Sequence, residues 1–120
     1  MIAHFKSMDK EGNINSFETK CEYKNGIFIF NDLATENTII YVTITDKSVT
    51  ITRKGNTNME LLLSLDEKTL GNYKNNLGLE FEFIVKTNEL VINNNQIYAD
   101  YSLFVENDLV NQQKMWLLFK

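Results

Sequence analysis

Apolar and polar residues alternate with a period of two along most of this chain. In the clearest run, residues 77–85, five apolar side chains share one face and two glutamates lie on the other. The apolar face holds Leu77, Leu79, Phe81, Phe83 and Val85, and the polar face holds Glu80 and Glu82. Residues 97–105 repeat the pattern. Such alternation is typical of a β-strand with one buried face, so the pattern predicts a chain built of strands.

Short turn signals separate the alternating runs. Asn25-Gly26 is the strongest, because a type I′ hairpin turn needs positive φ at both central residues. Short strands joined by short turns predict an antiparallel meander, since parallel pairs need long crossovers. The expected strands are about 2–9, 14–24, 27–31, 37–45, 48–54, 57–65, 77–86, 89–93, 96–106 and 112–120.

The stretch 58–70 fits two structures. Asn58 could cap a helix that Gly71 ends, and its leucine-rich composition favours a helix. Met59, Leu61, Leu63 and Leu65 also fit a period of two, and we favour the strand, although a short apolar run is ambiguous by pattern alone.

The order of these elements predicts one all-β domain over residues 1–120. No connection is clearly long enough for a Greek-key crossing, and the chain has no proline to protect a sheet edge. We therefore expect an antiparallel up-and-down β-barrel of about 8–10 strands rather than a sandwich. A barrel of this size is either filled by its own side chains or holds one small ligand, and the pattern does not choose between these.

Composition narrows the classes of partner. The 120 residues carry a net charge of −4, and only one of them, Arg53, is an arginine. A nucleic-acid partner is not expected, because phosphate neutralisation needs a clustered positive face. No apolar run reaches 18 residues, so we expect no membrane-spanning segment. The N-terminus lacks a secretory signal and Cys21 is the single cysteine, which together indicate the cytoplasm.

No catalytic constellation emerges from the residues. His4 and Cys21 are each the only residue of their type, and no paired Cys/His spacing of a metal site is present. Their pairing as base and nucleophile is a poor alternative. Glu80 and Glu82 fit a solvated outer face better than a pair of catalytic carboxylates. We therefore expect a protein that is not an enzyme and holds no metal or cofactor.

Several segments resemble, in order and spacing, the YwiB-like family of uncharacterised small bacterial proteins. The segments are Phe17-Glu18-Thr19 with Tyr23 and Asn25-Gly26, then Val49 to Gly55, then Tyr73, Gly78, Leu79, Phe81 and Phe83, and finally Tyr101. The similarity is weakest at Lys20-Cys21 and in the last strand. This resemblance implies a calycin-like (lipocalin-like) β-barrel and no established activity.

Five residues are candidates for ligand binding inside such a barrel: Arg53, Tyr73, Phe81, Phe83 and Tyr101. Arg53 alternates with Val49 and Ile51, which places its guanidinium on the apolar face, where it could hold the head group of an acidic apolar ligand. The alternative is structural, with Arg53 closing the barrel end, packed over Trp116 or another aromatic residue and hydrogen-bonded to carbonyls at the strand ends. The tyrosines have the same two interpretations, a pocket hydroxyl or a half-buried strand residue.

The final run, Met115 to Phe119, is apolar on both faces and indicates a doubly buried or interface strand. Two functions therefore remain open. The first is non-catalytic binding of a small apolar or amphipathic ligand in the barrel. The alternative is an interaction or assembly module with a solid core, forming a homodimer or heteromer.

Overall fold

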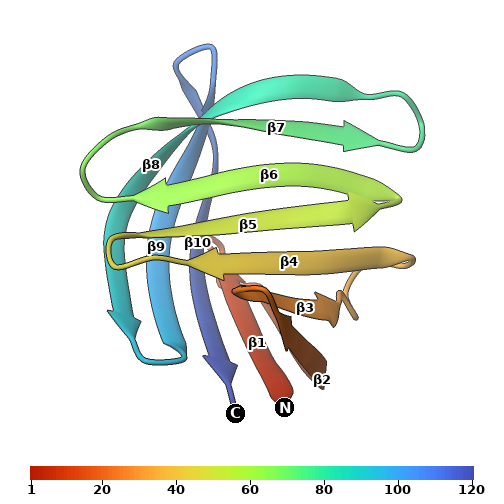
Figure 1. Cartoon of the computed structure of the whole chain (residues 1–120). Helices are drawn as coiled ribbons and strands as arrows, with labels where there is room; N and C mark the ends of the chain where they lie inside the picture. The colour runs from red at the N-terminus through yellow and green to blue at the C-terminus, as the bar shows by residue number, and fades with distance from the viewer.

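Ten antiparallel strands close into one barrel in the computed structural model, which describes residues 1–120 (Figure 1). The strands are β1 (Ile2–Asp9), β2 (Ile14–Lys24), β3 (Ile27–Asn31), β4 (Thr38–Ile44), β5 (Ser48–Gly55), β6 (Thr57–Ser64), β7 (Thr69–Asn75), β8 (Glu80–Asn93), β9 (Gln96–Val105) and β10 (Asp108–Phe119). Each strand pairs with its neighbours in sequence, and β1 pairs with β10 to close the sheet. The predicted up-and-down barrel is confirmed, and closure gives every strand a neighbour on both sides.

The connections behave largely as the turn chemistry predicts. Asn25 and Gly26 both have positive φ, 54° and 80°, as a type I′ hairpin turn between β2 and β3 requires. The stretch 58–70 is not a helix. It forms β6, the turn 65–68 and the start of β7.

One strand escaped the sequence prediction. We expected no strand between 65 and 77, yet β7 runs from Thr69 to Asn75 and pairs with both β6 and β8. Its inner positions include Gly71, where an added Cβ would overlap the Phe83 ring. A glycine at an inner position removes the apolar residue by which the alternation would be recognised, and this is why the pattern is silent here.

The strand expected at 77–86 begins later, at Glu80. Leu77 is 87 % exposed, and Leu79 and Phe81 are also exposed, so the first three residues of the predicted buried face are not in the core. The β7–β8 turn lies at the far end of the two strands (Figure 1).

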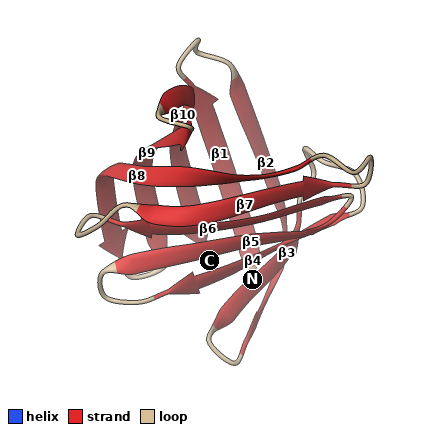
Figure 2. Cartoon of the chain, turned by 90° about the horizontal axis from the view of Figure 1, so that it is seen from above, coloured by secondary structure: helices blue, strands red, loops and turns tan.

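The expected strands 77–86 and 89–93 are one strand, β8, interrupted by a bulge between Thr87 and Glu89. A bulge adds one residue and bends the strand. β8 pairs with β7 only before the bend and with β9 on both sides of it, and thereby joins the two layers of the barrel that cross in Figures 1 and 2. The turn signal at 87–88 marked this bend.

Twenty buried apolar residues form the core inside the barrel. Met115, Leu117 and Phe119 supply its part on β10, and the Phe119 ring stacks on Phe28 with centroids 4.0 Å apart. Burying side chains of this size stabilises the fold by about 1.5–3 kcal/mol each.

The structure contains no helix long and apolar enough to cross a membrane.

The barrel has two unlike ends. We call the end formed by the β1–β2, β3–β4, β5–β6, β7–β8 and β9–β10 connections the mouth, and the opposite end, which carries both termini, the terminal end. At the mouth, the Asn56 N–H donates to the Asn37 carbonyl (3.2 Å) and the Asn76 N–H donates to the Asn56 carbonyl (3.0 Å). Three successive connections are therefore tied together along one side of the mouth.

Gly55 allows this close approach. Its φ is 143°, and a Cβ at this position would overlap the carbonyl oxygen of Asn37. Glycine is the residue that adopts such a backbone without strain. The β3–β4 connection is consequently held against β5, which fixes the position of Asp32 at its start.

Candidate functional site

A cavity of about 340 Å³ opens at the mouth, above the apolar core. Its walls come from both layers of the barrel: Phe5, Ser7, Asn15, Asp32, Ala34, Thr35, Arg53, Thr57, Met59, Tyr73, Tyr101, Leu103, Asn111 and Gln113. The wall residues on the strands occupy inner positions close to the mouth, where polar side chains replace the apolar ones found deeper. A small concave site with a few convergent polar groups is the usual form of a ligand pocket.

Arg53 and Asp32 form an ion pair in the wall of this cavity. The Nε of Arg53 donates to Oδ2 of Asp32 at 3.3 Å, and Nη1 lies 4.0 Å from the sulfur of Met59. The other carboxylate oxygen of Asp32 accepts the Ala34 N–H at 2.9 Å. The Asp32 side chain is 4 % exposed and that of Arg53 is 20 % exposed. Asp32 is thus fixed, and it holds the guanidinium with most of its N–H groups free.

Tyr101 presents a second donor to the cavity. The residue is 8 % exposed, and its hydroxyl makes no hydrogen bond within the chain, where every fully buried polar side-chain atom has a partner. The hydroxyl therefore keeps some contact with the cavity. Burial raises the pKa of Tyr101 above its usual value of 10.0, and the nearby Arg53 opposes part of that rise. The phenol is protonated at neutral pH and can donate.

Aromatic residues shape one side of the mouth. Tyr73 on β7 lines the cavity, and its ring stacks on Phe81 with centroids 5.1 Å apart. Phe81 supports Tyr73 from outside the cavity wall, and Phe83 lies deeper, in the core. Of the five candidate binding residues, the structure brings Arg53, Tyr73 and Tyr101 together around one space, and Phe81 and Phe83 are not part of its wall.

Sequence reasoning missed Asp32, although a signal for it exists. Phe28 and Phe30 occupy inner positions of β3, and Asp32 continues their alternation by one step. A carboxylate that continues an apolar face into a connection needs a cation or donors nearby when it is buried. That rule points to the chain's single arginine.

The suggested packing of Arg53 over Trp116 is wrong. Arg53 faces the inside of the barrel, whereas Trp116 lies on the outer face of β10, between Met115 and Leu117 of the core. On that outer face the Nζ of Lys6 lies 4.9 Å from the centre of the Trp116 ring, and the Tyr98 ring lies at 5.3 Å. Because side chains alternate between the two faces of a strand, Arg53 and Trp116 lie on opposite faces of the sheet and cannot pack together.

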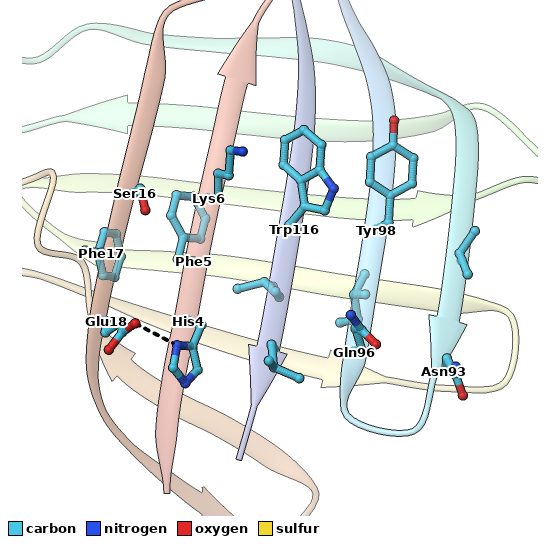
Figure 3. A pocket seen from close by; sticks show the side chains of 14 residues that line it. His4, Phe5, Lys6, Ser16, Phe17, Glu18, Asn93, Gln96, Tyr98 and Trp116 are labelled. Atoms are coloured by element: carbon cyan, nitrogen blue, oxygen red, sulfur yellow. Dashed lines mark ion pairs between the residues drawn. The ribbon is translucent and has the colours of Figure 1, made fainter.

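Trp116 belongs instead to a groove on the outer face, with a volume of about 380 Å³ (Figure 3). Strands β2, β1, β10, β9 and β8 contribute its side chains, among them His4, Glu18, Tyr98 and Leu118. The Nδ1 of His4 lies 3.1 Å from Oε1 of Glu18, as the dashed line in Figure 3 marks. This groove is open and its charged groups are already paired or stacked.

His4 and Cys21 do not meet. His4 faces outward, and Cys21 lies on the inner face of β2, where its thiol is directed to the Glu22 carbonyl at 3.5 Å. Burial raises the pKa of the Cys21 thiol, which disfavours the reactive thiolate. The base–nucleophile alternative is therefore wrong on geometry. Glu80 and Glu82 are both exposed on the outer face, as their alternation predicts.

Comparison with known proteins gives the fold and the family. The structure is similar to the crystal structure of the ywiB protein from Bacillus subtilis, with a TM-score of 0.74 and 18 % sequence identity over 99 % of this chain and 90 % of that one. Comparison with curated proteins finds no match. Residues 3–117 match a family described as a domain of unknown function, DUF1934. The resemblance to the YwiB-like proteins is confirmed, and this chain belongs to the DUF1934 family.

Proposed function

We propose that this protein binds a small amphipathic ligand in the mouth cavity without changing it chemically. The observation that carries the proposal is a pair of donors in the cavity wall. The Arg53 N–H groups that engage neither Asp32 nor Met59 are free, and the Tyr101 hydroxyl makes no hydrogen bond within the chain. A partly buried donor that has no acceptor loses its hydrogen bond to water without replacement, so a ligand oxygen is favoured there.

The apolar part of such a ligand is short. Phe5, Met59 and Leu103 offer it contact in the cavity, and below them the barrel is filled by side chains such as Leu61 and Leu63, which are at most 1 % exposed. The cavity of about 340 Å³ lies at the lower end of the range for ligand sites. A compact molecule fits this space, and a long acyl chain does not.

The test compares two matched tyrosine variants on one strand. Tyr101→Phe removes only the hydroxyl in the cavity, and Tyr98→Phe makes the same change on the outer face of β9. Native mass spectrometry of protein from its source cells, with a small-fragment screen by NMR, reports the ligand. We expect Tyr101→Phe to weaken binding about tenfold, the equivalent of one hydrogen bond, and Tyr98→Phe to leave it unchanged. Binding that is insensitive to Tyr101, or no binder in either experiment, contradicts the proposal.

A second candidate function is self-association through the outer groove. Trp116 and Leu118 interrupt the polar alternation of β10 on the outside of the barrel, and Val91 beside them is exposed. Lys6 and Tyr98 already cover part of Trp116, which weakens this candidate. Analytical ultracentrifugation of wild type and Trp116→Gln decides it, since a dimer that the substitution dissociates supports the groove as an interface.

We also propose the cytoplasm as the setting of the ligand-binding function. The buried free thiol of Cys21 supports it, because a single cysteine offers no intrachain disulfide to an oxidising compartment.

A further inference from the structure

We propose that the polar end of the ligand is an uncharged carbonyl group, an amide or lactam on a planar ring, rather than a carboxylate. The proposal rests on the binding function above and names its ligand class. It also departs from the acidic head group that Arg53 suggested from sequence, because the structure places a carboxylate of the protein beside that arginine.

The charge of the cavity wall is already balanced. Arg53 is its only cation and Asp32 its only acid, and the two are 3.3 Å apart. Asp32 cannot turn away, because its second oxygen accepts the Ala34 N–H and the side chain is almost fully buried. A ligand carboxylate on the free N–H groups of Arg53 would therefore lie close to the Asp32 carboxylate, and like charges in a partly buried site repel.

The connections around the mouth add to this repulsion. Apart from Asp32, the segments 10–13, 32–37, 56, 76–79 and 106–107 contain one lysine, Lys10, and three acids, Glu11, Glu36 and Glu106. A rim with an excess of negative charge lowers the local concentration of anions and leaves neutral molecules unaffected.

The remaining groups fit a neutral, planar group. The Arg53 N–H groups and the Tyr101 hydroxyl can donate to one carbonyl oxygen. The Asn15 and Gln113 amides on β2 and β10 offer both donors and acceptors, as the N–H of an amide or lactam requires. Phe5 and Tyr73 provide aromatic surface for a ring.

Benzamide and benzoate test the proposal, because they share a ring and differ in the charge of one planar group. Their dissociation constants are measured by ¹H–¹⁵N NMR titration of the whole protein up to about 10 mM, a range suited to fragments of this size. We expect benzamide to bind about tenfold more tightly or better, with shifts at Arg53 and Tyr101.

Asp32→Asn sharpens the test, since it removes the counter-charge and keeps the side-chain shape. In this variant the Arg53 charge is unbalanced, so benzoate should gain about tenfold or more while benzamide changes little. The matched control is Asp100→Asn, a buried carboxylate on the outer face of β9 that faces Asn88 and Gln112 and not the cavity. It should leave both affinities unchanged.

A wild-type measurement keeps the proposal testable if Asp32→Asn does not fold. Raising the salt from about 0.02 M to about 0.5 M should strengthen benzoate binding, because screening weakens the repulsion, and leave benzamide binding constant. Benzoate that binds as tightly as benzamide, or that weakens with salt, overturns the uncharged ligand class and leaves ligand binding in place. Absence of any shift at the cavity with either probe, together with no copurified molecule, overturns the proposed function and this inference with it.

Discussion

The same strands line both ends of the barrel, but their inner residues are apolar at the terminal end and largely polar at the mouth. At the terminal end the inner positions are apolar and fully buried, as at Val49 on β5 and Phe119 on β10. Nearer the mouth the same two inner faces carry polar residues. Gln113 lies on the inner face of β10 six residues from Phe119, and Arg53 lies on the inner face of β5 four residues from Val49.

This contrast separates stability from binding along the barrel axis. A filled terminal end contributes the hydrophobic stabilisation, while the mouth keeps donors, acceptors and space at the expense of packing. Four predictions compare the two ends, from the largest expected effect to the smallest.

Removing a side chain from the filled end should have the largest effect. Leu61→Ala deletes three carbons from a fully buried position, and we expect a loss of about 2–5 kcal/mol in the free energy of unfolding, measured in urea. Leu77→Ala at the mouth, where the side chain is 87 % exposed, should change it by less than about 0.5 kcal/mol. Equal losses at the two positions would contradict the division between the ends.

At the mouth, the ion pair should provide the next largest effect. Asp32→Ala leaves Arg53 without its carboxylate and Ala34 N–H without its acceptor, so we expect a loss of about 2–3 kcal/mol in urea unfolding. The variant Asp32→Ala with Arg53→Met should lose less than the two single losses added together, because the two residues interact. Strict additivity would show that the pair contributes nothing.

The tied connections of the mouth depend on Gly55. Gly55→Ala places a Cβ against the Asn37 carbonyl at a φ that favours glycine, and we expect a loss of about 1–3 kcal/mol, measured by urea unfolding. The control is Gly12→Ala, which has positive φ but open space around it, and should lose about 1 kcal/mol. A Gly55 variant no worse than the Gly12 variant would mean that the close approach is unimportant.

The smallest expected effect is on the free energy of unfolding at alkaline pH. The pKa of Tyr101 is raised in the folded state, so the folded protein keeps its proton when the unfolded chain loses it. This contribution to stability is fully present below about pH 10 and is lost as the pH rises through the folded pKa. Unfolding free energies measured from about pH 8.5 to 11 should therefore fall more steeply in wild type than in Tyr101→Phe. Parallel curves would contradict the burial of this phenol.

Much of the fold follows from local pattern. Alternation and turn residues predict the strands through β6 almost to the residue, because each strand has one apolar face and each turn has residues that tolerate its backbone. The prediction fails at β7, where Gly71 interrupts the inner face, and at β8, where a bulge resembles a turn. Both failures lie where the two layers of the barrel meet.

The candidate site could be predicted only in part. Arg53 and Tyr101 are inner residues by their period, whereas Tyr73 is a candidate that lies in no predicted strand. Asp32 was missed because it lies in a connection, where alternation is not expected to continue. Pattern assigns a side chain to a face of its own strand. It does not say how far along the barrel axis that strand places it.

By itself, the sequence determines an all-β chain, its antiparallel order and the inner face of most strands, because these depend on residues adjacent in the chain. Only the tertiary structure decides that Arg53, Asp32 and Tyr101 meet at one end of the barrel, that Trp116 faces away from them and that the interior is filled below the cavity. These outcomes depend on closure between β1 and β10 and on the stagger of ten strands, which accumulate over the whole sheet and are encoded in no single segment.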